Sequence, residues 1–381
     1  IKEELEKLGL REWSEFVHFG LTSQDINNTA IPLSLKRATE DVYLPLIDEV
    51  LSILHGLAIE WKSIPMLART HGQAASPVTL GKEIRVFEDR LRIQREQIAG
   101  ATYAAKFGGA TGGFNAHKVA YPGIDWPSFG TEFVEGILGL NRSKVTTQIE
   151  HYDHLAAWCD SLRRAHTVMI DLDMDVWTYV SMDYFKHKIV KGEVGSSAMP
   201  HKMNSRSCER VNGFHAILKG HLTMASNLAG DQWNEGDVSC SVVRRVMLPD
   251  AFFVADGLFE TCLTILNQME VYPDVINKEN ERYLPFLTTT TFLMECVKEG
   301  TGREAAHELI KKHAVAALQA LRSGEATEND LIDRLANDDG LKISKDRLDQ
   351  LLNAAATRAG AAGAQIEEFL NSIEEIKTII K

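Results

Sequence analysis

The 381-residue sequence has little of what disulfide-rich, membrane or nucleic-acid-binding proteins depend on. Its five cysteines are scattered and form no C-x-x-C pair, so they indicate neither a disulfide framework nor a zinc ribbon. No run approaches the roughly 18 apolar residues that a membrane helix needs, and no signal-peptide pattern opens the chain. A net charge of -12 disfavours a nucleic-acid or anionic-membrane surface. We therefore expect a soluble, cytoplasmic protein with no nucleic-acid or membrane partner.

Proline is also scarce, and none lies between Pro77 and Pro122, between Pro127 and Pro200 or after Pro285. Because proline breaks helix interiors, these gaps permit long helices. Alternating β-strand patterns are rare, whereas apolar residues recur at steps of three and four. The longest such stripe consists of Leu155, Trp158, Leu162, Ala165, Met169, Leu172, Val176 and Val180. The sequence therefore predicts an all-α fold, a bundle of long antiparallel helices.

Changes in pattern along the chain suggest domain boundaries. Residues 1–20 begin inside a charged amphipathic pattern, which we interpret as the remnant of an N-terminal helical domain whose earlier part is missing. We expect residues 21–270 to form the central helical bundle that carries the functional motifs. Residues 271–381 are expected to form a smaller C-terminal helical domain, with an apolar stripe at Ala305, Leu309 and Ala316.

The segment 192–204, Gly-Glu-Val-Gly-Ser-Ser-Ala-Met-Pro-His-Lys-Met-Asn, reads as a loop that leads into a helix. It brings the hydroxyl of Ser196 and the ammonium of Lys202 to a helix start. Free backbone amides and the helix dipole favour an anion there. By itself, the segment is also compatible with an ordinary interhelical loop that has Asn204 or Ser205 as its N-cap.

The whole string, with the Ser-Arg-Ser-Cys-Glu-Arg that follows it, resembles the signature of the fumarase/aspartase superfamily of lyases. These enzymes eliminate fumarate from succinyl-bearing substrates. The ending His-Lys-Met-Asn is most similar to the branch that acts on succinylated purine and imidazole nucleotides. The resemblance implies the superfamily's helical bundle, a reaction without cofactor or metal, and a homotetramer with active sites shared between subunits.

The same resemblance implies the catalytic roles. Ser196 is the base that removes a proton from the carbon beside a carboxylate, and His71 is the acid that protonates the departing nitrogen. Lys202 and Asn204 stabilise the carbanion, and Glu209 supports them. His71 lies in the string Arg-Thr-His-Gly-Gln, which we expect at the junction of two helices. Without the resemblance, a solvated or capping histidine would be the default interpretation.

Substrate binding is assigned in the same way. Thr22 opens a Thr-x-x-Asp capping box, and hydroxyls at a helix N-terminus can also bind carboxylates. The pair Ser241 and Arg245 matches a phosphate-binding Ser-x-x-x-Arg, although Arg244 is an alternative for the phosphate contact. Related enzymes often carry a further arginine after the tryptophan that is Trp233 here, and this chain lacks it. The residues assigned to the substrate are Thr22, Ser23, Gln148, Asn204, Arg210, Ser241 and Arg245.

Three alternatives stay open. Argininosuccinate lyase and fumarase belong to the same superfamily, but they typically have Gln-Lys-Lys-Asn or Gly-Lys-Val-Asn at the end of the signature. A di-metal carboxylate bundle would use Glu-x-x-His pairs, which occur at Glu15 and His18 and at Glu304 and His307. A non-catalytic homologue, such as the lens crystallins of this superfamily, is disfavoured by the intact Ser196.

Overall fold

The computed structural model describes residues 1–187, 199, 202–228, 233–236, 239–356 and 360–369. The chain divides into two compact units. The first comprises Ile1–Leu51, Asp89–Met174 and Ser205–Asn267, and the second comprises Ser52–Glu88, Asp175–Asn204 and Gln268–Lys381. The boundaries expected from the sequence, after residues 20 and 270, stay predictions.

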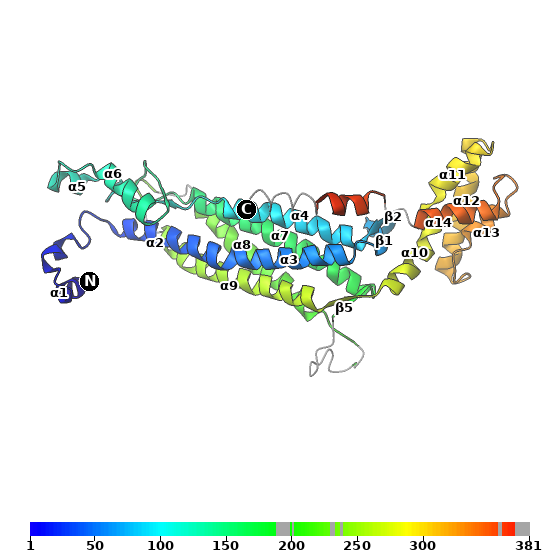
Figure 1. The fold of residues 1–381 in the computed structure, drawn as a ribbon, viewed down its shortest axis with the longest axis horizontal. Coiled ribbons are helices and arrows are strands. Elements are labelled where there is room, and N and C mark those ends of the chain that lie inside the picture. The colour runs from blue at the N-terminus through cyan, green and yellow to red at the C-terminus, as the bar shows by residue number, and fades with distance from the viewer. Residues whose placement is uncertain (188–198, 200–201, 229–232, 237–238, 357–359, 370–381) are drawn as a thin grey trace. The chain divides into compact units, whose positions relative to one another are not determined.

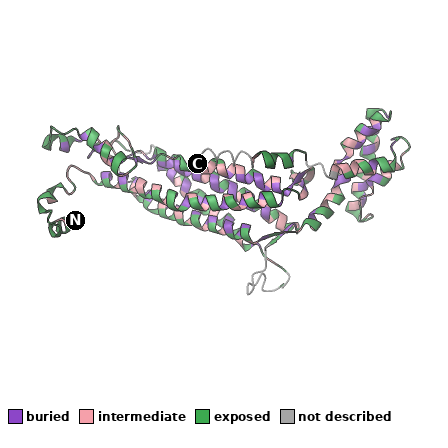
Figure 2. Cartoon of the chain, viewed as in Figure 1, coloured by how far each residue is buried: buried purple, intermediate pink, exposed green. Residues whose placement is uncertain are grey.

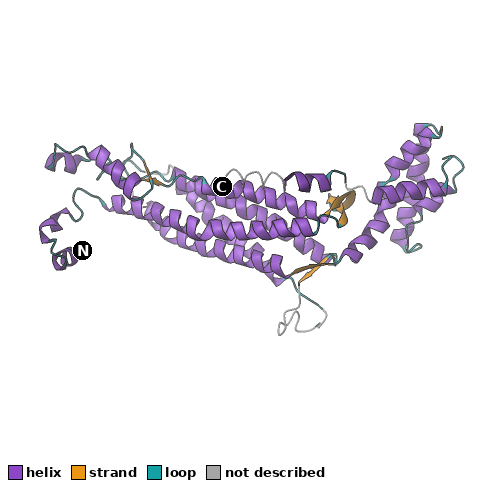
Figure 3. Ribbon diagram, viewed as in Figure 1, coloured by secondary structure: helices purple, strands orange, loops and turns teal. Residues whose placement is uncertain are grey.

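Helices dominate the described residues, and the strands are short (Figures 1 and 3). In chain order the elements are α1 (Lys2–Lys7), the 3-10 helix η1 (Arg11–Phe16), α2 (Ser23–Ala38), the π-helix η2 (Thr39–Tyr43), α3 (Leu44–Glu60), β1 (Pro65–Thr70), β2 (Gln73–Thr79), α4 (Leu80–Ala99), β3 (Ala104–Ala105), α5 (Asn115–Ala120), α6 (Trp126–Thr131), the π-helix η3 (Glu132–Ile137), β4 (Asn141–Arg142), α7 (Asp153–Ser181), β5 (Phe185–His187), α8 (Arg206–Leu228), α9 (Ser239–Gln268), β6 (Met269–Val271), α10 (Pro273–Leu287), α11 (Thr289–Lys298), α12 (Arg303–Ser323), α13 (Leu331–Ala336) and α14 (Lys345–Ala356).

Helices α4 and α7 pack antiparallel, as their side-chain pairs show. Arg90 on α4 donates to Asp171 on α7 at 2.8 Å, whereas Gln94, one turn further along α4, accepts from Arg164 at 2.9 Å. Later residues of α4 therefore contact earlier residues of α7. This arrangement confirms the predicted all-α bundle.

The stripe predicted for α7 faces the core. All of its positions from Leu155 to Val176 are buried, and only Val180, near the end of the helix, is half-buried. In Figure 2, buried positions recur along the long helices. The same face also buries polar groups that the pattern did not indicate, among them His166 and Asp173. His166 lies against His215 of α8, with 2.9 Å between the two Nδ1 atoms.

The helical stretch Ser23–Glu60 is long and apolar enough to cross a membrane by length and composition alone. Our expectation from the sequence did not include such a stretch. Within it, Ile47 and Val50 are fully buried, and Asp48 accepts two hydrogen bonds from Arg95 of α4 at 2.8 and 2.9 Å. Ile47 and Val50 therefore face the interior, the Asp48–Arg95 pair lies at the surface, and 28% of the apolar window is buried.

The second unit contains a β-hairpin that the sequence did not indicate. Strands β1 and β2 pair antiparallel, from Pro65 opposite Thr79 to Thr70 opposite Gln73. Arg69 of β1 forms an ion pair with Glu279 of α10 at 2.7 Å. The hairpin is therefore attached to the helices that follow later in the chain.

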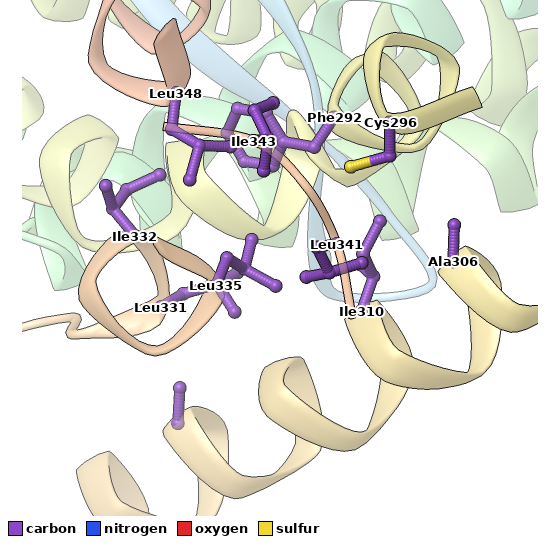
Figure 4. Packing of buried hydrophobic residues seen from close by; sticks show 11 residues of the cluster. Phe292, Cys296, Ala306, Ile310, Leu331, Ile332, Leu335, Leu341, Ile343 and Leu348 are labelled. Carbon is purple, nitrogen blue, oxygen red and sulfur yellow. The ribbon is translucent and has the colours of Figure 1, made fainter. Parts of the chain in front are cut away.

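Helices α11 to α14 enclose their own apolar cluster, which includes Phe292, Leu335 and Leu348 (Figure 4). From α12 the buried positions are Ala306, Ile310, Ala317 and Ala320. The predicted stripe, Ala305, Leu309 and Ala316, lies one residue before these fully buried positions: Ala305 is exposed, whereas Leu309 and Ala316 are half-buried and Leu309 packs against the cluster. Because apolar residues stand next to one another at each of these positions, the sequence supports either face of the helix, and packing selects one.

Asp173 is buried in the core of the first unit, and its carboxylate faces the Cys208 thiol rather than a nitrogen or oxygen donor among the described residues. The buried thiols of Cys208 on α8 and Cys262 on α9 are its neighbours. Burial raises the pKa of Asp173 from 3.8 to about 7, and the Cys208 thiol opposes this rise. Desolvation favours the neutral acid, so the folded protein holds a proton that the unfolded chain releases at lower pH.

We predict that Asp173→Asn removes a pH-dependent loss of stability. Because the pKa of Asp173 is higher in the folded than in the unfolded state, its proton stabilises the fold fully below the unfolded pKa. This contribution to the free energy of unfolding is lost as the pH rises to the folded pKa, and above pH 7 the loss amounts to about 4 kcal/mol. Urea unfolding of wild type should therefore show a fall between about pH 4 and pH 7 that the variant lacks. Asp171→Asn, on the exposed partner of Arg90, is the control. An identical pH dependence in wild type and Asp173→Asn would contradict this assignment.

Candidate functional site

The predicted site residues fall in both units. Glu209, Arg210 and the candidate residues at the starts of α2, α7 and α9 belong to the first unit, and His71, Lys202 and Asn204 belong to the second. Ser196 lies outside the described residues. The assigned roles therefore stay predictions, and the structure adds the local setting of each side chain.

The start of α2 presents Thr22 and Ser23, and the predicted capping box is present. The Thr22 amide donates to Oδ2 of Asp25 at 2.8 Å, and the Thr22 side chain accepts from the Asp25 amide. Ser23 is exposed. Because the Thr22 hydroxyl serves the cap, Ser23 is the hydroxyl of this pair that is open to a ligand.

Asp25 also holds a glycine-containing loop against the start of α2. Its Oδ1 accepts from the amides of Gly108 and Gly109 at 2.9 and 3.2 Å and forms an ion pair with Lys106 Nζ at 2.8 Å. Both side chains of this pair are fully buried. Gly109 has φ of +83°, a conformation that glycine adopts without the penalty of a side chain.

Gln148 lies in the segment before α7, and its position is fixed through its backbone. Its amide donates to the carbonyl of Glu235 at 2.9 Å. A Cβ on Gly236 would lie only 3.2 Å from Gln148 Oε1. The segment 233–236, where related enzymes often have an arginine, thus packs directly against Gln148.

The two arginines at the start of α9 differ in exposure. Arg244 is buried and donates to the hydroxyl of Tyr152, and its other terminal nitrogen lies 3.5 Å from Ser241 Oγ. Arg245 is exposed. Of the two candidates for a phosphate contact, Arg245 is therefore the one that faces solvent. Sequence reasoning missed Tyr152, because no motif marks it.

His71 forms the tip of the hairpin between β1 and β2. His71 and Gly72 are the two residues between the strand ends, with φ of +54° and +72°, and His71 is exposed. Positive φ at both central residues is typical of a type I′ turn. The expected helix junction was thus wrong, because short strands separate α3 from α4. This turn presents the imidazole to solvent.

Lys202 and Asn204 precede α8, and Glu209 and Arg210 lie in its first turns. All four side chains are exposed. The Lys202 amide donates to the carbonyl of Met199 at 3.0 Å. Among the described residues, no group of three or more His, Cys, Asp or Glu side chains could hold a metal ion.

Comparisons with known proteins agree with this layout. The family profile described as "Lyase" matches residues 1–218, and the profile "Adenylosuccinate lyase C-terminus" matches residues 285–369. The chain therefore belongs to the lyase family of the fumarase/aspartase superfamily, as the signature predicted. Within it, the similar curated proteins are adenylosuccinate lyases, which confirms the predicted branch.

The adenylosuccinate lyase of Dictyostelium discoideum is 54% identical over 52% of this chain and 44% of its own length. The adenylosuccinate lyases of Vibrio cholerae and Escherichia coli K12 are 36% and 35% identical over 78% of this chain, and over 65% and 64% of their own lengths. The chain thus spans about half to two thirds of these relatives.

Solved structures support the fold. The 3-carboxy-cis,cis-muconate lactonizing enzyme of Pseudomonas putida has a TM-score of 0.78 at 20% identity and covers 98% of this chain and 81% of its own. A fumarate lyase from Mesorhizobium sp. BNC1 has a TM-score of 0.75 at 20% identity and covers 97% and 84%. At these identities the likeness establishes the architecture.

We predict that Lys106→Met strongly destabilises the first unit. The substitution leaves the Asp25 carboxylate buried without its cation, and breaking one side of a buried ion pair typically costs about 3–5 kcal/mol. Lys7→Met is the matched control, since it removes the same group from the exposed pair with Glu4 and should cost less than about 1 kcal/mol. Urea unfolding of the two variants measures the difference. Equal stabilities would show that the Lys106 pair contributes little.

Proposed function

We propose that the chain is an adenylosuccinate lyase. It would cleave adenylosuccinate to AMP and fumarate, and the corresponding succinyl-carboxamide imidazole ribotide to the carboxamide ribotide and fumarate. The observation that carries this proposal is the 54% identity to an adenylosuccinate lyase, together with the matched C-terminal profile. The signature 192–204 supports it, because its ending is that of this branch rather than of argininosuccinate lyase or fumarase.

The reaction is a β-elimination. Ser196 accepts the proton from the carbon beside a carboxylate, the electron pair of that bond forms the double bond of fumarate, and the bond to nitrogen breaks. His71 gives a proton to the departing nitrogen. A serine acts as a base only where its alkoxide is stabilised, and Lys202 and the amides at a helix start supply that positive environment.

Lys202 and Asn204 stabilise the carbanion, and Glu209 supports the signature segment from the first turn of α8. The exposed hairpin tip suits the role of His71, because an acid must approach the leaving group while its own backbone stays fixed. No cofactor or metal takes part in this scheme.

The substrate's anionic groups are bound at helix starts. Ser23 lies at the N-terminus of α2, where the dipole favours the carboxylates of the succinyl part, and Thr22 caps that helix. Ser241 and Arg245 at the start of α9 take the phosphate, for which the planar guanidinium is suited. Gln148 and Arg210 complete the contacts.

The exposure of these side chains also favours an assembled site. Ser23, His71, Arg210 and Arg245 each face solvent in the single chain, whereas a nucleotide site normally buries most of its ligand. We propose that the protein is a cytoplasmic homotetramer in which other subunits complete each site.

The activity is tested directly by incubating the protein with adenylosuccinate or with argininosuccinate and following fumarate by absorbance. We expect fumarate from adenylosuccinate only. Release from argininosuccinate alone would favour the other branch, and release from neither would contradict the proposal.

We predict that His71→Asn lowers kcat by about 10² to 10⁴ without unfolding the hairpin. Asparagine removes the titratable ring but is favoured at the first central position of a type I′ turn, so the backbone is kept. His71→Ala is a poorer test, since it adds strain at positive φ. Steady-state kinetics and circular dichroism report both effects. If His71→Asn retained more than about a tenth of wild-type kcat, His71 could not be the general acid.

A further inference from the structure

Tyr152 adopts a backbone conformation that needs an explanation. It has φ of +64°, in the left-handed region, and its side chain is buried. Bulky residues rarely adopt this conformation, and they keep it only where surrounding contacts enforce it. The Tyr152 amide donates to Oε2 of the buried Glu150 at 2.9 Å, which closes a tight turn. The turn directs the ring into the first unit.

The hydroxyl of Tyr152 joins two further elements. It donates to Oδ1 of Asn28 on α2 at 3.1 Å and accepts from Nη1 of Arg244 on α9. Asn28 and Arg244 are each 2% exposed. Burial raises the pKa of Tyr152, so the phenol stays neutral and can donate and accept at once. A buried guanidinium needs acceptors, and this oxygen is one of them.

Each partner of the hydroxyl lies next to candidate substrate-binding residues. Asn28 is on the helix that Ser23 opens, and Tyr152 ends the segment that contains Gln148. Arg244 lies 3.5 Å from Ser241 Oγ and directly precedes Arg245. One oxygen atom therefore connects the three segments of the first unit that carry these residues.

The side chains of this network are buried in the first unit. A cavity of about 30 Å³ lies beside it, lined by Asn28, Tyr152 and Glu150 among others. This volume holds about one water molecule and is far too small for a nucleotide. Tyr152 can therefore act on a ligand only through the segments that it connects.

We propose that Tyr152 is a positioning residue, whose hydroxyl holds the α2 start, the Gln148 segment and the α9 start in the relative placement that binds substrate. The substrate named in this inference rests on the proposed function, whereas the role of the hydroxyl in holding the three segments together does not. With the hydroxyl in place, the three segments are already arranged for binding. Without it, substrate must order them when it binds, and this entropic cost weakens the affinity.

The test compares Tyr152→Phe with Tyr43→Phe. Tyr43 is equally buried in the first unit, and its hydroxyl lies 3.2 Å from the Phe252 carbonyl on α9, away from the candidate residues. Amide hydrogen exchange is followed in 22–30, 146–152 and 239–246, with KM and kcat for adenylosuccinate. For Tyr152→Phe we expect faster exchange in all three segments and a KM raised about tenfold, with kcat changed less than about threefold. Tyr43→Phe should leave these values at the wild-type level.

A second variant controls for the possibility that Tyr152→Phe unfolds as a whole. Asn28→Ala does not alter the residues of the strained turn but removes the α2 acceptor of the hydroxyl, and exchange should rise in 239–246 as well as around residue 28. An effect confined to α2 would overturn the proposal, as would unchanged exchange in Tyr152→Phe. An unchanged KM in an otherwise active Tyr152→Phe would also overturn it. Absence of fumarate release by wild type would refute the proposed function alone, because the exchange measurement needs no substrate.

Discussion

The buried carboxylate of Asp25 is the constraint on which the candidate binding surface of the first unit depends. It accepts from three backbone amides and pairs with Lys106. Two of these amides belong to the glycine loop and one to the cap of α2. An unpaired charge in this position would be strongly unfavourable, so all these partners must stay in place together. The start of α2 is therefore held rigidly where Ser23 meets solvent.

Arg244 is a second buried charged group that needs polar partners, in this case a cation. It is a buried cation whose described hydrogen bonds go to the hydroxyls of Tyr152 and Ser241. Among the described residues, its hydrogen-bond partners are neutral hydroxyls, and it directly precedes the exposed Arg245. In a chain with a net charge of -12, such local positive charge is what an anionic nucleotide needs.

The sequence predicted best where a long pattern averages over many residues. The α7 stripe was confirmed over nearly its whole length because a shift of one residue would expose all of its large side chains together. On α12, neighbouring apolar residues make both faces nearly equivalent, and the predicted stripe lies one residue before the fully buried positions. The hairpin that carries His71 was missed because burial does not alternate along its two strands, and because its turn depends on positive φ at a histidine, which the sequence does not signal strongly.

By itself, the sequence determined the helical class, the family and the identity of the motif residues, because these depend on local periodicity and on short strings of side chains. Only the tertiary structure decided that Arg244 is buried while Arg245 faces solvent, and that Tyr152 and Asn28 meet although they are far apart in the chain. The physical reason is that the cost of burying a polar group depends on partners from other segments. No window of sequence contains those partners, so their roles appear only when the chain is folded.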